Sequence, residues 1–129
     1  MFEIPPGVSI VWRRPGPNSP AATNGVDKIW IDPALSQAEI RCGIAHEIVH
    51  LEHRHQGHQP PAIERSVRYE TARRLIAIED LRAAVAWAQS PADLRDELGV
   101  TNMVLLDRLN CVTDDELLLL EHAASHHAI

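Results

Sequence analysis

The stretch of sequence that decides the fold is His46-Glu47-Ile48-Val49-His50. On an α-helix, residues four apart lie above one another on one face, so His46 and His50 present two imidazoles to one metal ion. Glu47 then lies one position round the helix, close to the same ion. Two His ligands with an adjacent carboxylate are the arrangement of zinc peptidases. The stretch therefore predicts Zn²⁺ bound by His46 and His50, with Glu47 as the general base.

The residues on either side predict that this stretch lies inside a helix. Ser36 and Glu39 have the spacing of a capping box, in which each side chain satisfies a backbone amide at the helix start. The helix is expected to run to about His53, because Gly57 and the Pro60-Pro61 pair follow. A zinc-peptidase motif requires this helical context.

Strand signals come before the helix. Residues 8–12 and 27–32 are short apolar runs, and Asn24-Gly25 is a strong turn signal between them. Pro33 ends the second run. We expect a small antiparallel sheet from these runs, with a third, weak strand near residues 21–24.

A second helix is expected from about Ala62, with an apolar stripe formed by Val67, Thr71, Leu75 and Ile78. Glu64 falls within about 20° of the centre of that stripe, whereas Glu70 lies about 100° away. A carboxylate on a buried face needs a cation or hydrogen-bond donors. Glu64 is therefore the predicted third metal ligand. Glu70 is the alternative third ligand. If Glu64 binds no metal, its expected role is to stabilise the start of the second helix.

Four short helices are expected beyond Ile78, at about residues 79–89, 91–98, 102–109 and 114–126. The middle pair has the pattern of a helix-turn-helix. Its second helix carries one basic residue, Arg108, beside the acidic Asp107, and the chain has 18 acidic residues against 12 basic ones. Direct DNA binding is therefore disfavoured, and packing or docking to a protein partner is expected of this part.

The fold class expected from these elements is α+β. Residues 1–78 are predicted to form a zincin-like core, in which the small antiparallel sheet packs on two helices, and residues 79–129 an all-helical extension. The length of 129 residues and the 45% of hydrophobic residues fit one domain with a small appendage. Cys42 and Cys111 form no Cys-x-x-Cys pair. No signal peptide and no membrane-spanning run is visible, so a soluble cytoplasmic protein is expected.

Several runs of the sequence have a familiar order. They are residues 29–33 (IWIDP), 35–39 (LSQAE), 41–42 (RC), 45–52 (AHEIVHLE), 64–67 (ERSV) and 72–77 (ARRLIA). Together they resemble the compact actinobacterial and phage branch of the ImmA/IrrE metallopeptidases over about residues 28–82. Ala77 stands where that family usually has Pro, and Val49 where Gly is common.

The resemblance implies a zinc metallo-endopeptidase. By position, it makes His46, His50 and Glu64 the zinc ligands and Glu47 the residue that activates water. It also implies a protein substrate, namely a helix-turn-helix repressor or antitoxin-like regulator of phage, mobile-element or stress genes. The residues leave a second class open: a non-catalytic, metal-stabilised module that docks a transcriptional regulator. Such a scaffold has no need of Glu47, which favours the enzyme.

Three further His residues follow the motif helix. His53, His55 and His58 are expected in a loop, where solvated positions are the first interpretation. The alternative is that one of them enters the cleft and stabilises the oxyanion of the reaction. Tyr69 is a similar candidate, with packing as its first interpretation.

Overall fold

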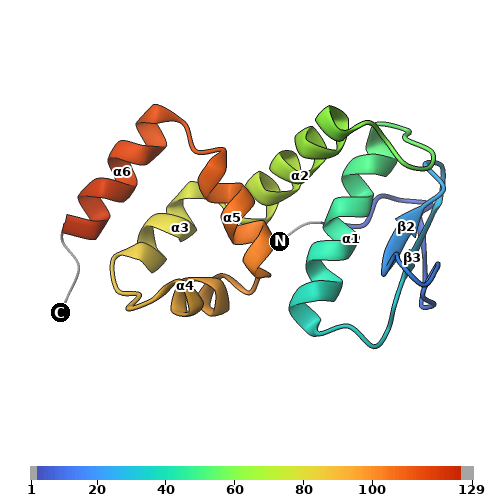
Figure 1. The fold of residues 1–129 in the computed structure, drawn as a ribbon, viewed down its shortest axis with the longest axis horizontal. Helices are drawn as coiled ribbons and strands as arrows, with labels where there is room; N and C mark the ends of the chain where they lie inside the picture. The colour runs from blue at the N-terminus through green and yellow to red at the C-terminus, as the bar shows by residue number, and fades with distance from the viewer. Residues whose placement is uncertain (1–2, 126–129) are drawn as a thin grey trace.

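A computed structural model describes residues 3–125 of the chain. It is an α+β structure with a three-stranded sheet and six helices, as expected. The strands are β1 (Ser9–Val11), β2 (Ala21–Thr23) and β3 (Lys28–Ile31). The helices are α1 (Gln37–Glu52), α2 (Pro61–Leu75), α3 (Ile78–Val85), α4 (Pro91–Leu98), α5 (Asn102–Asn110) and α6 (Asp114–Ser125). Figure 1 shows the sheet at one end of the molecule, α1 and α2 next to it, and α3 to α6 at the other end.

The sheet is mixed, so the prediction of a purely antiparallel sheet is wrong. The strand order is β1-β3-β2, with β2 antiparallel and β1 parallel to the central β3. The weak third strand near residues 21–24 is present as β2, and the Asn24-Gly25 turn joins it to β3 as a hairpin. The hairpin places β2 on one edge of β3, and β1 pairs with the other edge, where it runs in the opposite direction to β2.

Local hydrogen bonds hold both connections of the sheet. In the hairpin turn, the side-chain oxygen of Asn24 accepts from the backbone N–H groups of Val26, Asp27 and Lys28, each at 3.0 Å. In the longer connection between β1 and β2, Arg14 donates to the carboxylate of Asp32 at 2.8 Å and to two backbone carbonyls of the loop. These bonds stabilise the connections on either side of β2, which is an edge strand of the sheet.

The predicted capping box begins α1. Ser36 accepts from the Glu39 N–H at 3.1 Å, and the Glu39 carboxylate accepts from the Ser36 N–H at 3.0 Å. One face of α1 packs on the sheet through a cluster that we call the sheet-side cluster, made of Ile29, Ile31, Ile44 and Ile48. The motif stretch is therefore held on a helix whose direction the sheet determines.

The end of the second helix differs from the sequence expectation. Pro61 is its first residue, but α2 ends at Leu75, and Ile78 belongs to α3. Ile76 has an extended backbone and is fully buried. The apolar pattern thus continues through the break between the helices and conceals it in the sequence. Helix α3 also ends earlier than expected, at Val85 instead of 89.

The remaining helices lie close to their predicted positions. Helix α4 begins after the Ser90 cap and ends before Gly99, whose φ of 66° is left-handed. Helix α6 is described to Ser125, and His126, the last residue expected in it, lies outside the described residues. Residues 3–125 contain no helix that is both long and apolar enough to cross a membrane.

A second apolar cluster joins α1 to the helical end of the molecule. This tail-side cluster consists of Cys42, Ala45, Leu75, Ile76, Leu81, Val100, Leu105 and Leu120. Cys42 is buried in it, as expected of a packing residue. Helix α1 therefore packs on the sheet with one face and on the tail helices with another.

Candidate metal centre

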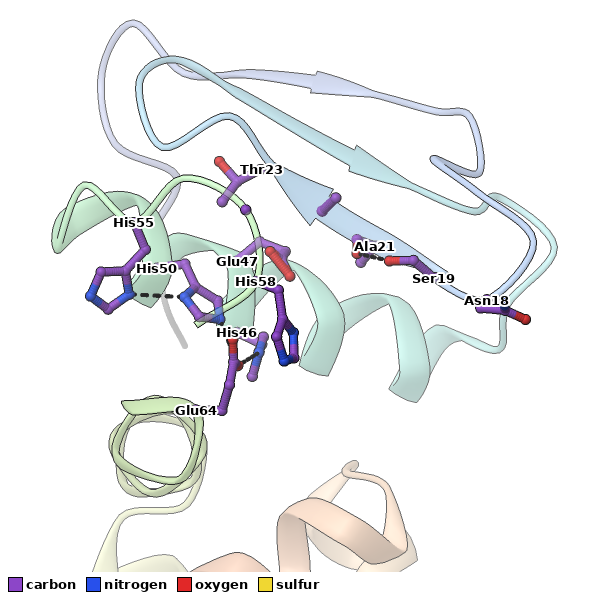
Figure 2. Close-up of a pocket in the computed structure, with 12 residues that line it drawn as sticks. Asn18, Ser19, Ala21, Thr23, His46, Glu47, His50, His55, His58 and Glu64 are labelled. Atoms are coloured by element: carbon purple, nitrogen blue, oxygen red, sulfur yellow. Dashed lines mark hydrogen bonds and ion pairs between the residues drawn. The ribbon is translucent and has the colours of Figure 1, made fainter. Parts of the chain in front are cut away.

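Two neighbouring helices bring the predicted ligands together. His46 and His50 lie on one face of α1 with their ring centroids 4.9 Å apart, as their four-residue spacing requires. Glu64, in the first turn of α2, reaches them from across the gap between the helices (Figure 2). One ligand atom from each of the three side chains lies within 4.8 Å of the other two. This group can hold a metal ion.

Hydrogen bonds orient the Glu64 carboxylate. Its Oε1 lies 3.1 Å from His50 Nε2 and 3.8 Å from His46 Nε2. Its Oε2 accepts from the backbone N–H of Gln59 at 3.2 Å. Gln59, just before the Pro60-Pro61 pair that starts α2, thus supplies the backbone donor that holds the carboxylate toward the two imidazoles.

Glu70, the alternative ligand, lies elsewhere. Its Oε1 is 3.0 Å from His53 Nε2, and its other oxygen pairs with Arg74. Arg74 also binds Glu52 of α1 through two hydrogen bonds. Glu70 therefore belongs to an exposed network of ion pairs that links α1 to α2, while Glu64 belongs to the metal-ligating group.

The protonation of the two imidazoles suits metal binding. Burial, and secondarily the neighbouring His50, lowers the pKa of His46 to about 4. Burial also lowers the pKa of His50. Both rings are therefore neutral near pH 7, the form in which His binds a metal. Two imidazole nitrogens and one carboxylate oxygen are a donor set that zinc takes, with a fourth position left open.

Glu47 lies beside this group. It is buried, with 7% of its surface exposed, and in Figure 2 it points from α1 toward the sheet, whereas Glu64 approaches from the opposite side. Burial, together with the negative charge of Glu64, raises the pKa of Glu47 to about 7. A carboxyl with that pKa exchanges a proton readily near neutral pH.

A cavity of 570 Å³ opens over these side chains. Its lining includes all four residues of the predicted site. The other lining residues come from the edge of the sheet and from the loop after α1: Asn18, Ser19, Ala21, Ala22, Thr23, His55, Gly57 and His58. The cavity therefore lies between the free edge of β2 and the predicted ligands.

The sequence interpretation missed parts of this site. His55 is half-buried, and its Nδ1 lies 3.0 Å from Nδ1 of His50, where a solvated loop position was the first expectation. His58 is exposed but lines the cavity, as the alternative for this loop allowed. The His-rich run itself was the available signal, but a loop has no periodicity from which to tell which ring turns inward. Tyr69 is half-buried and is not among the described residues that line the cavity.

Comparison with known proteins gives no match: no family model, no curated protein and no solved structure matches the chain.

Proposed function

We propose that the chain is a zinc-dependent endopeptidase. The observation that carries the proposal is the convergence of His46, His50 and Glu64 beside the buried Glu47, all facing one cavity. The three ligands come from two helices. If His46 and His50 were on one face of α1 by chance, there would be no reason for Glu64 of α2 to meet them. Glu47 is buried and lines the cavity, and a buried carboxyl in a cleft favours a catalytic role.

In the proposed mechanism, Glu47 moves the proton. Zinc held by His46, His50 and Glu64 would supply Lewis acidity, which polarises the peptide carbonyl and activates water. The Glu47 carboxylate accepts a proton from the attacking water and then donates it to the leaving amine. Burial keeps this carboxyl out of bulk solvent, and in the metal-free chain burial and the charge of Glu64 raise its pKa to about 7.

The free edge of β2 suits an extended peptide. The Asn24 N–H donates to the Lys28 carbonyl, and the Pro20 carbonyl accepts from the Asp32 N–H. Residues 20 and 24 flank β2, so the backbone groups of the even-numbered positions, Ala22 included, point toward β3. The backbone groups of Ala21 and Thr23 then point to the other edge, because successive residues of a strand alternate in this way. At this edge the Ala21 carbonyl accepts from the Ser19 hydroxyl at 2.8 Å, a bond that an added strand would replace. Ala21 and Thr23 both line the cavity. A peptide that adds a strand at this edge would pass over the ligands, which supports a protein substrate.

The proposed target is a helix-turn-helix repressor or an antitoxin-like regulator. This part of the proposal is supported by the resemblance of residues 28–82 to the ImmA/IrrE metallopeptidases. The net charge of −6 and the single Arg108 beside Asp107 in α5 support action on a protein instead of direct binding to DNA.

The test is cleavage by Glu47→Gln, which removes the base and keeps its shape. The zinc-loaded protein is incubated with candidate repressors, and the products are identified by mass spectrometry. We expect wild-type cleavage and a loss of at least about 100-fold in Glu47→Gln, because a positioned base contributes that much or more. Zinc content serves as the control and should not change. Equal cleavage by the variant would refute the mechanism, and an intact biological effect without cleavage would favour the non-catalytic module.

A further inference from the structure

The chain reverses direction at the end of α1 and brings His55 back to His50. The backbone N–H of His55 donates to the His50 carbonyl at 2.9 Å, and that of Arg54 donates to the Leu51 carbonyl at 3.0 Å. This pair of bonds is the Schellman arrangement, in which the residue after the cap is left-handed. Arg54 is that residue, with a φ of 58°. His55 is thus placed against the last turn of α1 by backbone geometry.

The side chains of His50 and His55 meet at their Nδ1 atoms. These atoms lie 3.0 Å apart, with the two rings 66° from coplanar and their centroids 5.2 Å apart. The other ring nitrogen of His50, Nε2, is the one that faces Glu64. Each nitrogen of His50 therefore has a separate partner: Nε2 faces the ligand group, and Nδ1 faces His55.

We propose that His55 is a positioning residue that holds His50 as a metal ligand, an inference that rests on the metal site proposed above. A metal on His50 Nε2 takes the lone pair of that nitrogen, so the ring proton must lie on Nδ1. The Nδ1–H then needs an acceptor, which the Nδ1 lone pair of His55 supplies. With its Nδ1 as the acceptor, His55 keeps Nε2 as the nitrogen that bears its ring hydrogen. Metal-binding His residues commonly rely on such an outer partner for tautomer and orientation, usually a carboxylate, carbonyl or water.

Packing against the sheet keeps His55 in this place. Gly25, in the β2–β3 turn, has a φ of 73°, and a Cβ added to it would lie 2.4 Å from the His55 carbonyl oxygen. Only glycine permits this close approach. On its other side, the His55 ring stacks on His53, with centroids 5.4 Å apart and planes 18° from parallel. The hairpin turn therefore supports His55, which in turn supports His50.

The experiment compares His55→Asn with His55→Leu. Asn and Leu have nearly the same size, but only Asn keeps an acceptor near the position of Nδ1. Zinc affinity is measured by competition with a chromophoric chelator, and the absorption spectrum of the Co²⁺-loaded protein reports the geometry of the ligands. We expect His55→Leu to weaken zinc binding by about 10–100-fold and to alter the Co²⁺ spectrum, with His55→Asn within a few-fold of wild type. His122→Ala removes an exposed imidazole of α6, which is not among the described residues that line the cavity, and should leave the zinc affinity unchanged.

Each outcome decides between the two proposals. If wild type binds zinc and His55→Leu binds it equally well, the positioning role is overturned while the metal site stands. If the wild-type protein binds no zinc, the proposed metal site and the positioning role of His55 are both overturned. Should His55→Leu not fold, the ring tautomers of the zinc-loaded wild type decide, measured by ¹⁵N NMR. The proposal expects a protonated Nδ1 on His50 and an unprotonated Nδ1 on His55, and a protonated Nδ1 on His55 would overturn it.

Discussion

At the scale of single residues, the four-residue helical repeat made His46, Glu47 and His50 predictable as a group. Glu64 was predictable as well, because its angle on the second helix pointed to a buried face. His55 was not, since its contact with His50 depends on the left-handed Arg54, and the sequence has no glycine there to indicate the reversal. Contacts set by a helix repeat can be read from sequence, whereas those set by an irregular turn require the structure.

Glu47 should destabilise the metal-free protein at high pH. Its folded pKa, about 7, lies above the ordinary value of 4.5, so ionisation costs folding energy as the pH rises through this interval. Glu47→Gln cannot ionise and should be more stable than wild type at pH 8, by roughly 3 kcal/mol from a shift of this size. The advantage should vanish near pH 4. Urea unfolding of both proteins at pH 8 and pH 4, with a chelator present, measures this difference in the free energy of unfolding. A wild type more stable than Glu47→Gln at pH 8 would contradict the expectation.

At the scale of elements, the helix starts were predictable and the strand directions were not. The Ser36–Glu39 box and the Ser90 cap are chemical signals for a helix start, and both are present in the structure. An apolar run of a few residues, by contrast, carries no information on whether its neighbour runs parallel or antiparallel. The parallel pairing of β1 with β3, at the edge opposite β2, is visible only in the assembled sheet.

The end of α1 carries strain that a substitution can remove. Arg54 is exposed, and its φ of 58° costs a residue with a Cβ roughly 1–2 kcal/mol. Arg54→Gly should therefore raise the free energy of unfolding by about 0.5–1 kcal/mol, after the greater entropy of glycine in the unfolded chain is allowed for. Arg65→Gly, at an exposed position inside α2, is the matched control and should lower it by about 1 kcal/mol. Thermal or urea unfolding measures the stability of both variants beside wild type. An Arg54→Gly variant less stable than wild type would refute backbone strain at this position.

At the scale of the whole molecule, α1 is the element shared by both apolar clusters. Its Ile44 and Ile48 pack on the sheet, while Cys42 and Ala45 pack in the tail-side cluster. Helix α5 is also tied to α2, because Arg68 forms two hydrogen bonds with the buried Asp107, the shorter at 2.7 Å. The division of the chain at residue 78 and the helix-turn-helix pattern of α4 and α5 stay predictions, since sequence periodicity identifies helices but not what they pack against.

The proposed metal ligands come from two neighbouring helices. His46 and His50 belong to α1 and Glu64 to α2, so a bound metal would hold the helices together across the cavity. An ion that binds only the folded chain stabilises the fold in proportion to its affinity. Metal affinity therefore reports directly on whether these three side chains act as one site.

The most direct test of the central claim is the zinc affinity of Glu64→Ala and Glu70→Ala beside wild type, measured by chelator competition on the metal-free proteins. We predict one tightly bound zinc in wild type and in Glu70→Ala, whose carboxylate lies in the ion-pair network with Arg74. In Glu64→Ala the affinity should fall by more than about 100-fold, beyond the loss expected for an outer contact alone. Wild-type affinity in Glu64→Ala, or no stoichiometric zinc in the wild-type protein, would contradict the metal centre proposed here.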